Sequence, residues 1–189
     1  MKDASAKGFA LGEMPRGTPM ETVDEQFVRA PAEVVFRIAS RVEEWPTHLA
    51  HYRYVKFRER KPDGGGVVEM SAYRPFELGS AGGAIVNWPT WWLSMMSVNV
   101  ARPSIRFRHI GGITKGMDVE WEFHRRSANE TQVRIMHAWD GPRWPGIGRL
   151  AATLVIGPVF VHGIASRTLA GLAKVAERDG GRQDGSEGA

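Results

Sequence analysis

Apolar residues near the C-terminal end of the chain recur at helical spacing. At about 100° per residue, one side of the helix collects Val161, Ile164, Ala165, Thr168, Leu169, Leu172, Val175 and Ala176. The opposite side collects Arg167, Lys174, Glu177 and Arg178. A helix with one apolar stripe packs that stripe against a core. The pattern therefore predicts a long amphipathic helix, with Leu172 and Val175 buried and Lys174 in solvent.

We expect this helical segment to span residues 145–178. Pro145 suits a first helical turn, where the missing N–H is not needed. Pro158 removes a hydrogen bond inside the pattern and predicts a kink or two helices in series. Around Pro158 the apolar residues, Phe160 among them, surround the helix. This part should be covered on both sides, or contact a ligand or a partner protein.

Upstream, shorter segments alternate apolar and polar residues and predict antiparallel strands. These segments are 22–29, 52–60, 67–73, 91–101, 105–110, 117–124 and 131–139. Residues 61–66 read Lys-Pro-Asp-Gly-Gly-Gly and predict a hairpin turn. Residues 74–90 contain Gly and Pro clusters and predict a long irregular link. Two short helical segments, starting near Pro31 and Val42, follow the first strand.

This order predicts an α+β fold: a curved antiparallel sheet of about seven strands around a long C-terminal helix. Such a sheet needs a cover over its concave face, and the C-terminal helix is long and apolar enough to provide it. A ligand cavity is then expected between sheet and helix. We expect a disordered leader over residues 1–20, one domain over 21–178 and a disordered tail over 179–189.

Composition narrows the class of protein. The chain has 189 residues, 42% of them apolar and 24% charged, which fits one soluble domain. The absence of cysteine excludes disulfides, thiolate metal sites and a cysteine nucleophile. No secretory signal core is visible, and the longest apolar run is short of the ~20 residues of a membrane span. A cytoplasmic location is expected, and contact with a membrane surface stays open.

Seven tryptophans predict an aromatic-lined interior. Strand alternation places Trp91, Leu93, Met95, Ser97 and Asn99 on one face, which we assign to the interior. Two further strands present inward sets, and the members of these sets are Met117, Val119, Trp121, Phe123, Val133, Ile135, His137 and Trp139. Ser97, Asn99 and His137 are then polar groups among apolar neighbours. They either pair with each other and the backbone or orient a ligand.

Other chemistries find no support. His48 and His51 share a spacing of three but have no evident third ligand, so no metal is expected. The glycine clusters lie in hairpins, which argues against a phosphate-binding loop. Arg106 and Arg108 alternate with apolar residues and are expected on a solvated outer face, so no nucleic acid partner is expected. No cofactor is expected, and the oligomeric state stays open.

The segment from Ala30 to Phe36, the Glu44-Trp45-Pro46 step and the order of elements resemble the helix-grip (START/SRPBCC) superfamily. Residues 116–123 and the Arg167-Thr168-Leu169 segment are most similar to its polyketide cyclase/dehydrase branch. Trp45 and Tyr52 match the spacing of a Trp-Pro step and a pocket tyrosine in aromatase/cyclases. On an inward strand of those enzymes, Ser97 matches a serine, whereas Asn99 stands where they carry an arginine.

The resemblance implies an internal cavity for a hydrophobic or polyketide-like small molecule, with cyclase/dehydratase activity as one outcome. Tyr52 and Asn99 are then the catalytic candidates: Tyr52 would donate a proton, and Asn99 a neutral hydrogen bond. The ligand-binding candidates are Trp45, Trp91, Met95, Ser97, Trp121, His137, Trp139 and Phe160. The alternatives are a non-catalytic lipid, quinone or isoprenoid carrier and a protein-interaction module. Whether the chain is an enzyme stays open.

Overall fold

The computed structural model describes residues 11–78, 84–141 and 162–186. Its elements are, in chain order, β1 (Met20–Val28), α1 (Ala32–Ser40), the 3₁₀ turn η1 (Val42–Glu44), α2 (Trp45–His48), β2 (Tyr52–Arg60), β3 (Gly66–Leu78), β4 (Ala84–Asn99), β5 (Ser104–Gly112), β6 (Asp118–Ser127), β7 (Glu130–Trp139) and α4 (His162–Ser186). The expected kink at Pro158 and the contacts of Phe160 lie outside the described residues.

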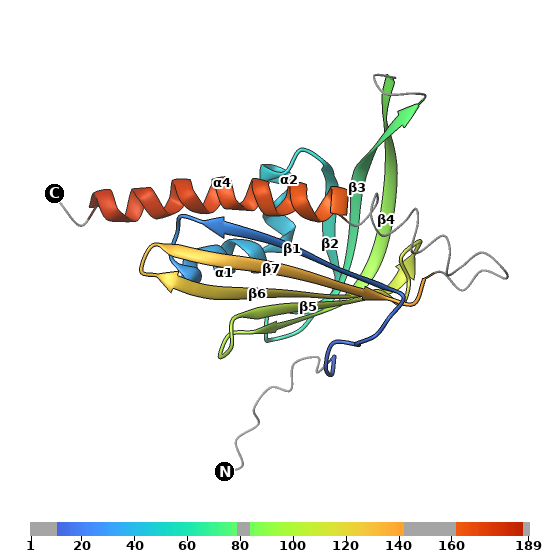
Figure 1. The fold of residues 1–189 in the computed structure, drawn as a ribbon, viewed down its shortest axis with the longest axis horizontal. Helices are drawn as coiled ribbons and strands as arrows, with labels where there is room; N and C mark the ends of the chain where they lie inside the picture. Colours follow the sequence, from blue (N-terminus) through green and yellow to red (C-terminus); the bar gives the residue numbers. More distant parts are fainter. Residues whose placement is uncertain (1–10, 79–83, 142–161, 187–189) are drawn as a thin grey trace, which may run out of the picture.

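The strands form one antiparallel sheet of seven in the order β1-β7-β6-β5-β4-β3-β2. Figure 1 shows α4 lying across one face of this curved sheet. The helix contacts β1 at one edge and β3 near the other, so it bridges the concave face. The predicted architecture, a curved sheet covered by the C-terminal helix with two short helices after the first strand, is confirmed.

The register predicted for α4 is also confirmed. Leu172 and Val175 are buried in the core, whereas Lys174 is exposed. At Gly171 the helix passes so close to Leu49 that a Cβ atom would overlap that side chain. A residue without a side chain at this position therefore lets α4 settle onto the short helix α2 and the loop that follows it.

The helix extends further than expected, through residues assigned to a disordered tail. It ends at Ser186, and Gly180 is buried against Ala30 and Pro31. Residues 179–186, expected in the tail, continue α4 in the structure. The glycine and charge content of this segment suggested disorder, but contacts with the start of α1 stabilise the added turns.

Of the predicted irregular link 74–90, residues 74–78 belong instead to β3 and residues 84–90 to β4, and the two strands pair antiparallel (Figure 1). Pro75 and Pro89 had suggested breaks. In this part of the hairpin β3 has already left β2, and β4 has not yet reached β5. Both strands are then edge strands, where a proline without an N–H group can be accommodated.

The N-terminal segment also departs from expectation, because residues 11–19 pack against the outer face of the sheet. The backbone carbonyls of Leu11 and Gly12 accept hydrogen bonds from Arg108 (3.1 Å) and Arg106 (2.9 Å). Asp118 accepts from both guanidinium groups. Arg106 is therefore buried, not solvated as predicted, and the part of the expected leader that the structure describes is held in place.

Candidate functional site

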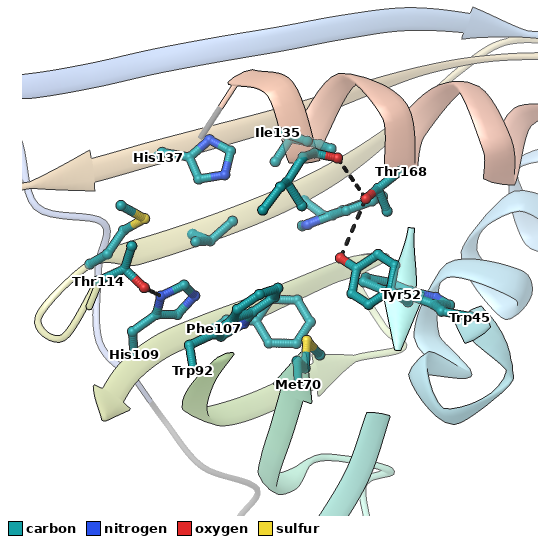
Figure 2. Close-up of a pocket in the computed structure, with 15 residues that line it drawn as sticks. Trp45, Tyr52, Met70, Trp92, Phe107, His109, Thr114, Ile135, His137 and Thr168 are labelled. Carbon is teal, nitrogen blue, oxygen red and sulfur yellow. Dashed lines mark hydrogen bonds between the residues drawn. The ribbon is translucent and has the colours of Figure 1, made fainter. Parts of the chain in front are cut away.

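A cavity lies between the concave face of the sheet and α4 (Figure 2). Its described lining comprises Trp45, Tyr52, Met70, Trp92, Phe107, His109, Thr114, Met117, Val119, Trp121, Ile135, His137, Ile164, Ala165 and Thr168. The cavity offers about 80 Å³ to the centres of water-sized molecules. One water needs about 10–15 Å³ by this measure, so a small organic molecule has room.

An aromatic cluster forms one wall of the cavity. Trp45, the first residue of α2, packs edge-on against Tyr52 with ring centroids 5.3 Å apart. Its other neighbour is Trp121 of β6, at 5.6 Å. The indole Nε1 of Trp45 is buried without a hydrogen-bond acceptor among the described residues. Aromatic surfaces of this kind bind flat or apolar molecules.

Thr168 of α4 contacts several polar groups beside this aromatic wall. Its Oγ1 lies 2.7 Å from the carbonyl oxygen of Ile164, 3.1 Å from Nε2 of His51 and 3.3 Å from the hydroxyl of Tyr52. A carbonyl has no proton, so the contact with Ile164 requires Thr168 to donate its only proton there. Oγ1 then accepts from both other groups: Nε2 of His51 carries a proton, and Tyr52 donates.

This arrangement bears on the expected role of Tyr52. Its single hydroxyl proton is directed at Thr168, and its oxygen keeps lone pairs that can accept (Figure 2). Burial raises the pKa of Tyr52 above its ordinary value. As described, Tyr52 is therefore placed to accept a hydrogen bond from a ligand more readily than to protonate one.

A second polar pair lies away from Tyr52 along the cavity. Nδ1 of His109, on β5, lies 2.7 Å from Oγ1 of Thr114. Trp92 separates the two ends: its ring lies 6.2 Å from that of Tyr52 and stacks 6.0 Å from His109. Figure 2 shows the same order, with Phe107 beside Trp92 in the middle. The site is thus an apolar channel with a polar group at each end.

Two histidines at the site, His51 and His109, are electrically neutral near pH 7. Burial lowers the pKa of His109 to about 3. Burial, and secondarily the charge of Arg167, lowers the pKa of His51 to about 4. The described lining contains no Lys, Arg, Asp or Glu. An anionic ligand would find no counter-charge among these residues, and burying an unpaired charge is costly.

The structure brings four of the predicted site residues to the cavity: Trp45, Tyr52, Trp121 and His137. His137 is buried, with Nδ1 3.3 Å from the hydroxyl of Thr22. Trp139 is on the predicted inward face and buried, but it does not line the cavity; its Nε1 donates to the carbonyl of Lys115 at 3.0 Å. Its predicted contact with the ligand is therefore replaced by a packing role.

The interior face predicted for β4 is wrong. Trp91 is 52% exposed, whereas Trp92 is 7% exposed and lines the cavity. Met95 and Ser97 share the outer face with Trp91, opposite Arg108 and Arg106 of β5. Both alternating sets of this strand are apolar, so alternation alone cannot choose between them, and a shift of one residue exchanges the faces.

Asn99 is likewise not a site residue. It is exposed at the end of β4, and its Oδ1 accepts a hydrogen bond from the backbone N–H of Arg102 at 3.0 Å. This contact closes the turn before β5. Asparagine commonly bonds to nearby backbone in turns, and this local role explains the residue without any catalytic function.

His109, Thr114 and Thr168 were not among the residues predicted for the site from the sequence. Ile105, Phe107 and His109 alternate on β5 opposite the outward arginines, so strict alternation would have placed His109 inside. Thr168 lies in the apolar stripe of the helix, where a hydroxyl among apolar residues is a signal. Thr114 lies in a loop and carries no comparable pattern.

Within the described ranges, no group of three or more His, Asp or Glu residues is placed to hold a metal ion. No helix of the described part of the chain is both long and apolar enough to cross a membrane. What the described residues do form is an apolar cavity with few polar groups under α4.

The fold and the cavity together define a ligand-binding protein of the helix-grip type. Residues 28–156 match the family model described as polyketide cyclase / dehydrase and lipid transport, and the chain belongs to this family. No protein with curated annotation shows significant sequence similarity to the chain.

Solved structures show the same fold. The Zhui aromatase/cyclase of Streptomyces sp. R1128 aligns with a TM-score of 0.67 at 20% identity, covering 84% of this chain and 93% of that one. A protein of Thermus thermophilus gives 0.63 at 19% identity, covering 82% and 94%. A START superfamily protein of Mycobacterium smegmatis gives 0.56 at 16% identity, covering 87% and 99%.

Proposed function

We propose that this protein binds a neutral, hydrophobic small molecule of flat aromatic or polyketide-like character in the cavity under α4. The observation that carries the proposal is the lining itself: apolar and aromatic side chains with few polar groups and, among the described residues, no Lys, Arg, Asp or Glu. Such sites recognise ligands by buried apolar area and by a few placed hydrogen bonds. The neutrality of the lining favours ketones, phenols and quinones over fatty acids.

Cyclisation and dehydration of a poly-ketone are the enzymatic form of this proposal. Support comes from the family and from the structural similarity to the Zhui aromatase/cyclase. A cavity that bends a poly-carbonyl chain would favour one ring closure by position. The place of Asn99 in the turn before β5 argues against this role for it, and the engagement of the Tyr52 proton by Thr168 argues against it for Tyr52. These features favour binding without chemistry, as in a carrier of quinones or isoprenoids.

A ligand screen tests the binding proposal. Tryptophan emission and melting temperature would be followed with neutral aromatic polyketides, quinones, sterols and fatty acids. We expect the neutral flat compounds to change both signals, because Trp45, Trp92 and Trp121 line the cavity. If all four classes leave both signals unchanged, the cavity is not a ligand site.

A paired measurement separates the enzyme from the carrier. Dissociation constants and product profiles would be compared for the wild type and Tyr52→Phe with a poly-ketone substrate. In an enzyme that uses Tyr52, turnover falls about 10²–10³-fold, the usual effect of losing one donor to a developing oxyanion, with little change in affinity. In a carrier the products match the uncatalysed background for both proteins.

A further inference from the structure

The two polar ends of the cavity differ in the kind of hydrogen bond that they offer. The end at Tyr52 is set by Thr168. Because the proton of Thr168 goes to the Ile164 carbonyl, the proton of Tyr52 goes to Thr168. What Tyr52 can offer a ligand is its oxygen, which accepts.

The end at His109 has the opposite character. Thr114 is 2% exposed, and among the described residues its hydroxyl has one hydrogen-bond partner, Nδ1 of His109. A buried hydroxyl that keeps its proton unpaired costs about 1–3 kcal/mol. The arrangement that avoids this cost has Thr114 donating to Nδ1. In neutral imidazole the proton then resides on Nε2, which has no protein partner among the described residues. What His109 can offer a ligand is therefore an N–H donor.

We propose that the cavity binds its ligand in one direction, with a ligand hydroxyl donating to Tyr52 Oη and a ligand carbonyl accepting from His109 Nε2. The aromatic ring of Trp92 lies between these two groups and supports the apolar body of the ligand. The chemical class is thus a neutral hydroxy-ketone on a flat scaffold, such as a phenolic aryl ketone. This inference rests on the proposed binding function and adds orientation to it.

The neutrality of both ends supports this class. The lowered pKa of His109 keeps its ring uncharged near pH 7, so it is a donor at Nε2 and not a cation. The described lining holds no cation that would favour a carboxylate over a ketone. A ligand with hydrogen-bond acceptors at both ends would place an acceptor against the oxygen of Tyr52, which itself accepts. A ligand with donors at both ends would place a donor against the N–H of His109, which itself donates.

Three naphthalene probes of nearly equal size test the orientation. 6-Acetyl-2-naphthol has both groups; 2-acetylnaphthalene lacks the hydroxyl; 6-isopropenyl-2-naphthol replaces the carbonyl oxygen with a CH₂ group. Calorimetry should show the first binding about 2- to 10-fold more tightly than either of the others, the effect of one net hydrogen bond. Equal binding of all three overturns the orientation and leaves the binding function standing. If none of the three binds, the proposed orientation fails, and the ligand screen decides separately on the binding function.

Variants assign each preference to one end. In Tyr52→Phe the preference for the hydroxyl should be lost and that for the carbonyl kept, and His109→Phe should show the reverse. In Thr168→Val the proton of Tyr52 is released, so capping the hydroxyl of the first probe as a methyl ether should no longer weaken binding. A purely structural role of Thr168 would weaken all probes alike and would contradict the inference.

One measurement needs no ligand and no variant. Proton–nitrogen NMR of the histidine rings distinguishes a proton on Nε2 from one on Nδ1. We expect the Nε2–H form for His109 near pH 7. Observation of the Nδ1–H form would overturn the assignment of a donor to this end.

Discussion

The hydroxyl of Tyr52 and Oγ1 of Thr168 lie 3.3 Å apart, which joins the sheet to the covering helix at the wall of the cavity. Thr168→Val removes the acceptor used by Tyr52 and by His51 while keeping the shape of the side chain. We expect a loss of about 1–3 kcal/mol in unfolding free energy, the cost of leaving buried polar groups unpaired. Urea unfolding measures this loss.

The matched control is Thr168→Ser, which keeps the hydroxyl and removes one methyl group. Its cost should be about 0.8 kcal/mol, that of one buried carbon. If the valine variant is as stable as the wild type, the hydroxyl does not connect the helix to the sheet in solution.

Trp91 and Trp92 are neighbours in the chain that lie on opposite faces of β4. Trp92→Phe should weaken the binding of a flat aromatic ligand several-fold, because the larger indole surface at the cavity is lost. Trp91→Phe alters an exposed side chain and should leave affinity unchanged. Ligand titrations of the two variants check this difference. If only Trp91→Phe weakens ligand binding, the ligand contacts the Trp91 face of β4, which strand alternation predicted to be inward.

Leu172 contributes to stability through the contact of α4 with the core. It is 2% exposed, so Leu172→Ala should cost about 2–5 kcal/mol in unfolding free energy. Lys174→Ala, two residues away on the exposed side, should change stability by about 0.5 kcal/mol or less. Equal effects of the two substitutions in chemical denaturation would contradict the register of the helix.

Asp118 of β6 forms an ion pair with the buried Arg106 of β5 on the outer face of the sheet. Oδ1 of Asp118 lies 3.1 Å from Nη2 of Arg106. Asp118→Ala leaves a buried guanidinium short of its partner, which typically costs about 3–5 kcal/mol. We expect a cost near the lower end of this range, because Glu120 still lies 3.7 Å from Arg106. Glu33→Ala breaks an exposed pair with Arg125 and serves as the control, with about 0–1 kcal/mol expected. Thermal unfolding of the two variants distinguishes these costs.

Stability should fall as the solution becomes acidic. Histidine in the unfolded chain has a pKa near 6.5, whereas the folded values are about 4 for His51 and about 3 for His109. Below about pH 6.5 the unfolded state therefore binds more protons, so this stabilisation is complete above that pH and is lost as the pH falls through the folded values. His109→Gln should flatten the dependence between about pH 6.5 and 4, measured by urea midpoints.

Periodicity in the sequence was sufficient to predict the architecture and the inward faces of several elements. The α4 stripe with Leu172 and Val175, and the inward sets on β6 and β7, follow from spacings of about 3.6 and 2 along the chain, which the polar positions mark clearly. Trp121 and His137, assigned inward by strand alternation, and Trp45 and Tyr52, singled out by the family resemblance, all line the cavity. The family resemblance indicated the chemistry only in outline, because one fold serves many ligands.

The tertiary structure decided what local pattern leaves open. Trp91 and Trp92 give β4 two apolar faces, and the choice between them depends on which face meets α4. An asparagine at position 99 is compatible with a turn or with a ligand site. The hydrogen bond from the backbone N–H of Arg102 to Oδ1 of Asn99 places it in the turn. The direction of the Tyr52 proton depends on Thr168, 116 residues away in the sequence. Contacts between distant segments set these properties, and no spacing within one segment encodes them.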